Sequence, residues 1–367
     1  MCDNLKRYFA IKKALKQPYP GDPQGNLARH LDTLAIFVSG IVASGSTSLT
    51  KIAQSVPQAA KPNSRIRRLE RWLDNKRITP QTYYLPSLRL LLQSLTDGPL
   101  VLVMDGSLVG RNGVLLALNL VYKKRAIPLC WIVVKGKKGH LPVEVPLQLL
   151  QAAADFLPPD RNVLFLGDGE FDGVELIRAV QNLGYHYVCR TARNIQLREQ
   201  GEKFSPNDLM LQPGDEIELP DVLWTQEEYG PVLIGIVWKP GWKDPLVLVS
   251  NFEILEEAFH WYQLRFKIET FFSDQKSRGF FLHKSHISDP EHLNRLLIGT
   301  CLAYLWIVCL GALVVERGWL PRIHRKSRCD WSLFRIGLAW LIYCLNEDRA
   351  LTVLFRLPRE CLWSLNP

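Results

Sequence analysis

The sequence of 367 residues lacks the cysteine and histidine arrangements that hold zinc or form redox-active pairs. Its eight cysteines include no C-x-x-C pair and no Cys/His cluster with zinc spacing. Several, such as Cys130 and Cys301, lie in apolar runs, so we expect buried thiols in a reducing compartment. The chain also contains no internal repeat and no low-complexity segment. These absences exclude a zinc finger and a repeat array, and the composition is that of an ordinary folded protein.

Long uncharged runs are scarce as well. Leu296–Val315 has no charge over twenty residues and is therefore long enough to span a membrane. The N-terminus lacks the uninterrupted apolar core of a signal peptide. Because the apolar run stands alone, we interpret it as the buried helix of a soluble, cytoplasmic protein that has no membrane partner. A single-span membrane protein is the alternative.

Positive charge is abundant and unevenly distributed. The net charge of +9 favours a polyanionic partner. Residues 61–77 carry seven Lys/Arg against two acids, and residues 322–328 add four more basic residues. Residues 199–229, by contrast, hold nine acids. This sorting of charge is typical of a protein that binds nucleic acid with particular regions, although a solvated basic helix also explains the first of them.

The N-terminal region, residues 1–98, is expected to be helical and to bind DNA. After Pro62, Asn63 or Ser64 could cap a helix that runs to about Trp72. Two short helices around a turn, the second of them basic, fit a helix-turn-helix. The exposed side of the basic helix would carry four arginines: Arg65, Arg67, Arg68 and Arg71.

Residues 99–193 change to a pattern of strands and helices. Leu100–Met104 and Asn162–Leu166 are continuous apolar runs, which indicate strands buried on both faces. Two further strands are joined by a basic turn, Lys123-Lys124-Arg125. The order of three strands, helix, strand, helix and strand is shared by the α/β ribonuclease-H-like fold. In that fold the first and fourth strands lie side by side and run parallel.

The remaining regions complete this expected architecture of a mixed sheet flanked by helices. Residues 194–250 are rich in Pro, Gly and acids and are expected to form a mostly β insertion before the last catalytic helix. Residues 251–318 return to the core, and residues 319–367 form a helical C-terminal region for dimerisation or DNA contact.

A polar stripe crosses an otherwise apolar helix expected at Ala258–Lys276. Tyr262, Arg265, Glu269 and Lys276 are spaced i, i+3, i+7 and i+14. At about 100° per residue, their Cβ atoms lie within roughly 60° of one another. A tyrosine, an arginine, a carboxylate and a lysine aimed at one place suit a phosphate and a metal ion.

Asp105 and Asp168 each follow an apolar strand and precede a glycine. If the two strands are adjacent and parallel, both carboxylates emerge at the sheet edge where α/β proteins bind ligands. Glu269 above that edge would complete a cage of oxygen donors suited to Mg²⁺ or Mn²⁺. Two such ions, about 4 Å apart, can activate water and stabilise the leaving oxygen in phosphodiester cleavage. A lone Asp-Gly is more often a simple turn.

The spacing of the stripe, Tyr-x2-Arg-x3-Glu-x6-Lys, resembles the YREK signature of bacterial DDE cut-and-paste transposases, an insertion-sequence family. The resemblance spans residues 99–315, including the β insertion between the second aspartate and the glutamate. It implies that Asp105, Asp168 and Glu269 form the catalytic triad, which binds two Mg²⁺ or Mn²⁺ ions. It also implies that the other stripe residues hold phosphates of the transposon end: Tyr262, Arg265 and Lys276.

The resemblance extends to positions outside the stripe. The segment DGEFD resembles the family's second-aspartate motif, in which the leading residue, Asp168, is the ligand. Asp172 is then expected to cap the helix that follows. The family places basic contacts to DNA after the fifth strand, where this chain has Arg190 and Arg193. A surface pair of arginines is the plain alternative.

The family also uses an aromatic residue of the insertion to stack a base flipped from the duplex. The position just before strand 246–249 is Pro245 here, so the match is imperfect. Trp242 and Trp238 are the nearest candidates, whereas Trp224 lies among acids and is disfavoured. Each tryptophan has a plain alternative as a buried core residue.

The resemblance implies a DNA transposase that binds double-stranded DNA at terminal inverted repeats and cuts at the transposon ends. In the family, the freed 3′-hydroxyl makes a hairpin, water reopens it, and the same hydroxyl attacks target DNA. Two protomers are expected to form a homodimeric synaptic complex through the C-terminal helices, at the nucleoid of a bacterium. The alternatives are a ribonuclease-H-like nuclease that cuts without joining and a catalytically inert, transposase-derived DNA-binding regulator.

Overall fold

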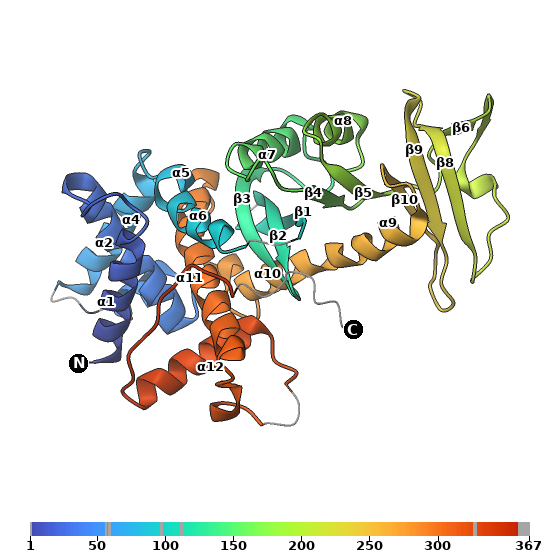
Figure 1. Cartoon of the computed structure of the whole chain (residues 1–367). Helices are drawn as coiled ribbons and strands as arrows, with labels where there is room; N and C mark the ends of the chain where they lie inside the picture. The colour runs from blue at the N-terminus through green and yellow to red at the C-terminus, as the bar shows by residue number, and fades with distance from the viewer. Residues whose placement is uncertain are drawn as a thin grey trace.

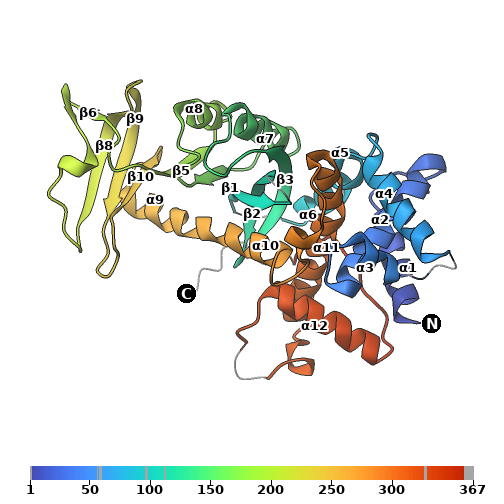
Figure 2. The same cartoon turned by 180° about the vertical axis from the view of Figure 1, so that it is seen from behind.

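The structure is a computed structural model that describes residues 2–55, 57, 60–95, 98–110, 113–325 and 329–358. N-terminal helices, a mixed sheet with its covering helices, and C-terminal helices follow one another along the chain (Figure 1). The insertion lies at one end of the molecule and the N-terminal helices lie at the other, as the view from behind also shows (Figure 2). Residues 326–328 of the basic segment and Cys361 lie outside the described residues.

The N-terminal region is helical, as the sequence predicts. Its basic helix begins at Pro62, whose fixed φ suits the first helical position, and packs Leu69, Trp72 and Leu73 against the neighbouring helices. The helices of the region are α1 (Asp3–Lys16), α2 (Gly25–Ser44), α3 (Leu49–Gln54), α4 (Pro62–Asp74), α5 (Pro80–Tyr83) and α6 (Leu85–Gln93).

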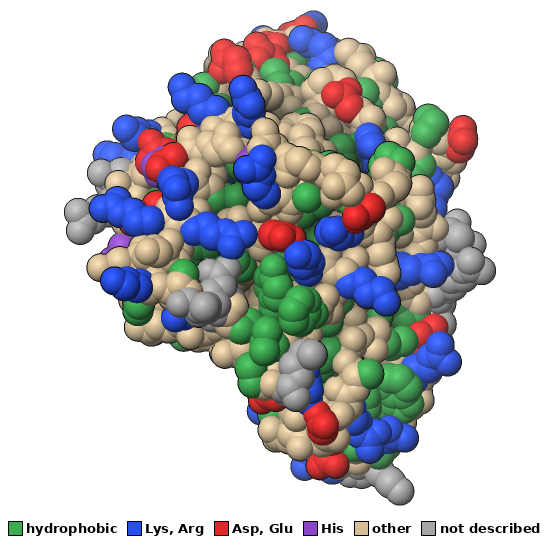
Figure 3. Space-filling model, turned by 90° about the vertical axis from the view of Figure 1, so that its left-hand side faces the viewer, with side chains coloured by type: hydrophobic (Ala, Val, Ile, Leu, Met, Phe, Trp, Pro, Cys, Tyr) green, Lys and Arg blue, Asp and Glu red, His purple; other side chains and the backbone are tan. Residues whose placement is uncertain are grey.

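The four arginines of α4 do not all lie on its exposed side. Arg67 and Arg71 are exposed. Arg65 is half-buried and donates from Nη1 to a backbone carbonyl of α3 at 3.1 Å. Arg68 is also half-buried and donates from Nε to the hydroxyl of Thr33 in α2 at 3.0 Å. Lys and Arg side chains are nevertheless prominent across this end of the molecule (Figure 3).

The core is a ribonuclease-H-like sheet, which confirms the predicted fold. Its ten strands are arranged in the order β3-β2-β1-β4-β5-β10-β9-β8-β6-β7. β1 pairs in parallel with β4, as expected, with Val103 opposite Leu166. The strands are β1 (Leu100–Val109), β2 (Gly113–Tyr122), β3 (Arg125–Lys135), β4 (Val163–Gly167), β5 (His186–Thr191), β6 (Leu197–Glu199), β7 (Glu202–Phe204), β8 (Glu216–Trp224), β9 (Tyr229–Val237) and β10 (Leu246–Ser250).

The insertion is mostly β, as predicted, and it prolongs the core sheet. β10 pairs antiparallel with β5 on one side and with β9 on the other. The insertion also contains a short 3₁₀ helix, η1 (Pro206–Asp208). The sheet therefore runs without a break from the core strands into the insertion, which fixes the position of the insertion relative to the core.

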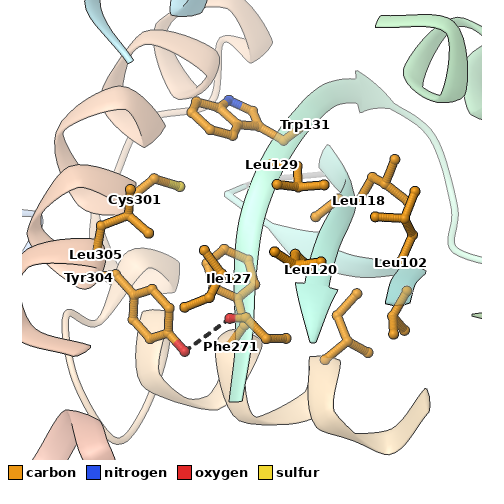
Figure 4. Close-up of a cluster of buried hydrophobic side chains, with 14 of the residues drawn as sticks. Leu102, Leu118, Leu120, Ile127, Leu129, Trp131, Phe271, Cys301, Tyr304 and Leu305 are labelled. Carbon is orange, nitrogen blue, oxygen red and sulfur yellow. Dashed lines mark hydrogen bonds between the residues drawn. The ribbon is translucent and has the colours of Figure 1, made fainter. Parts of the chain in front are cut away.

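Helices cover the core strands on both faces, which explains their continuous apolar sequences. α7 (Glu144–Ala154) and α8 (Val174–Asn182) lie above the sheet in Figure 1, and α10 (Ile268–Gln275) lies below it. In the lower layer, Phe271 of α10 and Tyr304 face Ile127 of β3 (Figure 4). The Tyr304 hydroxyl donates to a backbone carbonyl at the start of β3 at 3.1 Å. Arg125, expected in a turn, is instead the buried first residue of β3.

The helix expected at Ala258–Lys276 is divided into three consecutive segments. These are α9 (Leu255–Tyr262), the 3₁₀ helix η2 (Gln263–Lys267) and α10. The tighter 3₁₀ turn keeps the axis running in nearly the same direction, so the segments form one rod (Figures 1 and 2). The rod runs from the insertion, beneath the sheet, to the C-terminal helices.

The long apolar run is a core helix, as predicted. α11 (Pro290–Glu316) packs on β3, α2 and α12 (Leu333–Asn346). Of its most apolar 18-residue stretch, 89% is buried inside the protein. α2 is also long and apolar enough to span a membrane, and 56% of its most apolar stretch is buried. The chain then returns to the core, where Trp306 donates from Nε1 to the carbonyl of Thr352 at 2.9 Å. Two 3₁₀ helices flank these elements: η3 (Leu282–Lys284) and η4 (Leu320–Arg322).

The cysteines of the described residues are all free thiols. Cys301 is fully buried in α11, and Cys130 is half-buried in β3. Burial raises the pKa of the Cys301 thiol well above its usual value. The position of Cys301 confirms the expected buried thiol, whereas Cys130 is only partly buried and its thiol donates to the carbonyl of Leu149 at 3.5 Å.

Candidate active site

The two predicted aspartates lie level with each other at one edge of the sheet. The parallel pairing of β1 and β4 ends at Val103 and Leu166, and Asp105 and Asp168 each follow two residues later. Asp105 is not in a turn, because β1 continues to Val109 and pairs with β2 throughout. Asp168 does begin a turn, and its Oδ1 accepts a hydrogen bond from the amide of Glu170 at 3.0 Å.

Both aspartates and the predicted glutamate surround the guanidinium of Arg265. Its Nη1 is 3.5 Å from Oδ2 of Asp105, and its Nη2 is 4.0 Å from Oδ2 of Asp168 and 3.9 Å from Oε1 of Glu269. The Arg265 side chain is 11% exposed. Neither its Nε nor its Nη1 has a hydrogen-bond partner of good geometry. Three carboxylates on three different elements therefore share one loosely held cation.

The carboxylates differ in their access to solvent. Asp105 is 4% exposed, whereas the Glu269 side chain, in the first turn of α10, is 60% exposed. Within the part of the chain that the structure describes, no three His, Cys, Asp or Glu side chains stand close enough to hold a metal ion. The acids are instead spaced around the guanidinium, which lies between them.

The carboxylates at this edge of the sheet are stabilised by nearby positive charge. Burial raises the pKa of Asp105, and the carboxylate of Asp168 raises it further, while Lys138 and Arg265 oppose the shift. Hard oxygen donors from β1, from the turn after β4 and from α10 suit Mg²⁺ or Mn²⁺. The donor set and the orphaned nitrogens of Arg265 thus fit a site that exchanges one cation for another.

Two residues at this edge were not predicted from the sequence, Lys138 and Ser107, and Glu170, which the DGEFD motif disfavours as a ligand, also lies beside Asp168. Lys138 places Nζ 3.0 Å from Oδ1 of Asp105. Burial alone would lower the pKa of Lys138, but the surrounding acids, Asp105 first, raise it overall. The pKa of Glu170 is raised by burial and by Asp168. The direction of β3, which is antiparallel to β2 and so parallel to β1, is the signal that could have placed Lys138 here.

The outer members of the stripe lie on either side of the carboxylates. Lys276 follows the end of α10 and donates from Nζ to the hydroxyl of Ser107 at 2.6 Å. Burial, with the nearby charge of Lys138, lowers the pKa of Lys276. Tyr262 is 2% exposed at the end of α9, and burial raises its pKa to about 12. The stripe therefore remains on one side of the rod despite the 3₁₀ turn.

A hollow of about 580 Å³ lies next to Tyr262, between the rod and the insertion. Its aromatic walls come from Trp242, Phe259, Tyr262 and Phe266, and Pro245 also lines it. Three cations contribute to its lining: Arg190, Lys239 and Lys267. A larger hollow of about 850 Å³ beside α9 contains four glutamates and has the wrong charge for DNA: Glu216, Glu218, Glu256 and Glu257.

The other predicted contacts have different surroundings. Trp242 is 41% exposed, whereas Trp224 is 1% exposed. Trp238 is half-buried and donates from Nε1 to the carbonyl of Trp242 at 3.0 Å, so it supports the hairpin that carries Trp242. Arg190 is exposed, and Arg193 forms an ion pair of 3.5 Å with Asp244.

Asp172 does not cap the helix after Asp168. The cap position of α8 is Gly173, and no side chain bonds to the free amides of its first turn. The expectation of an Asp172 cap was therefore wrong, because the turn that orients Asp168 delays the start of the helix to Val174. Burial raises the pKa of Asp172.

Two comparisons with known proteins found similarities to transposases. A family model described as Transposase DDE domain matches residues 115–306, which is just over half of the chain. The matched span contains Asp168 and Glu269 and begins after Asp105. No curated protein matches the chain. The chain is also similar to a piggyBac transposase, solved by cryo-EM in a synaptic complex with hairpin DNA. The identity is 12%, the TM-score is 0.47, and the match covers 94% of this chain and 79% of that one.

Proposed function

This chain belongs to the transposase DDE domain family, and from that premise we propose that it is the DNA transposase of an insertion sequence. It would bind terminal inverted repeats, cleave DNA at the transposon ends and join the freed ends to target DNA. The observation that supports this best is the arrangement of Asp105, Asp168 and Glu269 around one guanidinium at the carboxyl edge of the sheet.

The three acids would bind the metal ions of the reaction. Two Mg²⁺ or Mn²⁺ ions supply an activated oxygen nucleophile and stabilise the leaving oxygen in such sites. Asp105 and Asp168 come from adjacent strands and so provide a rigid pair of donors. Glu269 is exposed on α10 and would complete the set. Arg265 would then pair with a phosphate of the DNA, to which its planar fork is well matched.

The DNA end would lie along the rod formed by α9, η2 and α10. Tyr262 and Lys276 would contact its backbone on either side of the cleavage point, and Arg190, near the end of β5, would extend this path. The aromatic hollow near Tyr262 would accept a base flipped from the duplex, with Trp242 as the exposed stacking surface. A flipped base held in this hollow would be consistent with an intermediate in which the DNA ends form hairpins.

The other partners follow from charge and from the family. The N-terminal helices would bind the terminal repeat, mainly through the exposed Arg67 and Arg71 of α4, because Arg65 and Arg68 are half-buried against α3 and α2, whereas Arg67 and Arg71 bond to residues of α4 itself. A homodimer would bring two ends together in a synaptic complex, and target DNA would enter afterwards. We place the protein in the cytoplasm of a bacterium, at the nucleoid.

Replacement of Glu269 by Gln tests this function. The variant should bind a duplex that carries the terminal repeat as the wild type does, but it should lose Mg²⁺-dependent cleavage by at least about 10³-fold. Glu256→Gln, an exposed site on the same rod, is the matched control and should cleave normally. Full cleavage by Glu269→Gln would overturn the site assignment.

The same assay separates the alternative functions. Incubation of the cleaved end with a supercoiled plasmid should give joined products if the protein is a transposase. A nuclease of the same fold would give cleavage without joined products. An inert regulator would bind the repeat and give no cleavage with either Mg²⁺ or Mn²⁺.

A further inference from the structure

The loop of residues 136–143 joins β3 to α7 and brings a second cation to the active site. β3 and β1 are both antiparallel to β2, so they run in the same direction. The loop after β3 therefore emerges at the edge of the sheet that carries Asp105 and Asp168. Lys138 lies in the middle of this loop and is not one of the four polar residues of the stripe on the rod, Tyr262 to Lys276.

Lys138 and Arg265 are two cations at the carboxylate of Asp105, whose Oδ1 also accepts a hydrogen bond from the amide of Gly106 at 2.6 Å. Nζ of Lys138 is 3.0 Å from Oδ1, whereas Nη1 of Arg265 is 3.5 Å from Oδ2. The Arg265 side chain is 11% exposed, but that of Lys138 is 40% exposed. Lys138 thus has an open path to solvent, and its flexible four-carbon stem allows its ammonium group to change partners.

The loop itself is fitted to the site by Glu170 and Gly139. Gly139 has φ of +83°, in the left-handed region that favours glycine. A Cβ atom at Gly139 would lie 3.7 Å from Oε1 of Glu170. The backbone beside Lys138 is therefore in contact with Glu170 in the acidic turn after β4, and Gly139 also hydrogen-bonds to the Glu170 carboxylate through its backbone.

The charge at this edge changes when metal ions bind. Four acids, Asp105, Asp168, Glu170 and Glu269, lie near two cations, Arg265 and Lys138. Two divalent ions would replace both cations as partners of the acids and leave the ammonium of Lys138 without a carboxylate. A DNA phosphate at the metals supplies the negative charge that it then needs.

We propose that Lys138 is a positioning residue that exchanges partners during the reaction. In the DNA-free protein it pairs with Asp105, and in the complex it binds a non-bridging oxygen of a DNA phosphate next to the cleavage point. With Lys276, which bonds to Ser107 at the same edge, it holds the strand from two sides. This inference rests on the proposed function, because it requires DNA at the metal site. The alternative is that Lys138 only neutralises Asp105.

The test compares Lys138→Gln with Lys137→Gln, an exposed lysine of the same loop. The first measurement is Mn²⁺ binding without DNA, by calorimetry. Loss of the ammonium group frees an oxygen of Asp105, so Lys138→Gln should bind Mn²⁺ several-fold more tightly than the wild type. Lys137→Gln should match the wild type. An unchanged Mn²⁺ affinity in Lys138→Gln would show that the pair with Asp105 does not compete with metal and would overturn the exchange.

The second measurement is binding of the terminal-repeat duplex with Ca²⁺, which occupies oxygen sites, as a function of salt. Lys138→Gln should bind about tenfold more weakly, and its plot of log K against log salt should lose about one unit of slope. Lys138→Arg should restore most of the affinity. If Lys138→Gln binds the duplex like Lys137→Gln, the role in DNA binding is wrong even though the protein still cleaves DNA. If the wild type neither binds nor cleaves the duplex, the proposed function itself fails.

Discussion

Two arginines connect the rod to the sheet, and they do so in opposite ways. Arg125, at the start of β3, bonds to a single acid, Asp274 of α10, with 2.7 Å between Nη1 and Oδ2. Arg265, in η2, lies 3.5 to 4.0 Å from three acids and leaves Nε and Nη1 without a hydrogen bond. Both side chains are 11% exposed. Burial alone therefore does not distinguish the two sites.

The difference lies in how completely each pair satisfies its members. A short, single ion pair fixes α10 on the sheet. Opening this pair is unfavourable, because each partner alone would be an uncompensated buried charge. A cation that is shared among three acids at long distances can leave when a better cation arrives. The first arrangement is therefore structural, and the second is suited to a reaction in which the cations of the site change.

The largest expected effect is on stability, from Arg125→Ala. The substitution removes the cation that opposes the raised pKa of Asp274, whose side chain is 5% exposed, so the acid must stay buried as an unpaired carboxylate or take up a proton. Removal of one partner from such a pair costs about 3–5 kcal/mol of unfolding free energy. Urea denaturation of the full chain would measure it. The comparison fails if Arg125→Ala and Arg265→Ala destabilise the protein equally.

Arg265→Gln should instead affect activity far more than stability. We expect a smaller loss of unfolding free energy than for Arg125→Ala, because the contacts of Arg265 with the acids are 3.5 to 4.0 Å long and Asp105 keeps Lys138 as a partner. Cleavage should fall by about 10²-fold, because a charged donor for the DNA phosphate is lost. Mg²⁺ should raise the melting temperature of the variant more than that of the wild type, since it relieves the repulsion among the three acids. A melting temperature that does not respond to Mg²⁺ would contradict the view that the guanidinium and the metal share a site.

A fall in pH should stabilise the fold at the Arg125–Asp274 pair but reduce DNA cleavage at the candidate active site. Burial raises the pKa of Asp274 to about 6, against the opposing charge of Arg125. A raised pKa means that the folded state binds the proton more tightly, so this group favours folding at low pH, and that contribution is lost as pH rises through about 6. Relative to Asp274→Asn, the wild type should gain about 2 kcal/mol as pH falls from 7 to 4. A difference that is constant with pH would refute this.

At the candidate active site the same fall in pH should reduce function. Burial raises the pKa of Asp105 as well, so its proton competes with metal at a pH where exposed aspartates are still ionised. Cleavage should therefore decline with falling pH before the protein loses stability. A titration of Mn²⁺ affinity against pH would follow this competition directly.

The sequence predicted the parts of this site that depend on local patterns. The apolar runs that end at Asp105 and Asp168 predicted buried strands. The order of strands and helices, which the ribonuclease-H-like fold shares, implied that these two strands are parallel neighbours, and the structure confirms the pairing. The spacing of Tyr262 to Lys276 predicted a common side of one helix. It could not predict the 3₁₀ turn at Gln263–Lys267, in which Arg265 still lies 3.9 Å from Glu269 of α10. Patterns with a regular period survive such local changes of geometry.

Contacts between segments far apart in the sequence were beyond these patterns. Lys138 was missed because its loop meets Asp105 only through the path of β2 and β3. Arg125 was expected in a solvated turn, since nothing near it in the sequence indicates Asp274, which lies 149 residues away. Arg65 and Arg68 were expected on an exposed side, because helical periodicity cannot show that α2 and α3 pack there.

The smallest expected effect is on DNA binding, and it compares an exposed arginine of α4 with a half-buried one. Arg71 is exposed, whereas Arg68 donates to Thr33 and is half-buried. If α4 contacts DNA phosphates, Arg71→Gln should weaken binding of the terminal repeat a few-fold and lower the slope of log K against log salt by about one. Arg68→Gln should leave that slope unchanged and act only through the packing of α4 on α2. The reverse result would mean that α4 turns its Arg68 side toward the DNA, which requires the contact with α2 to open on binding.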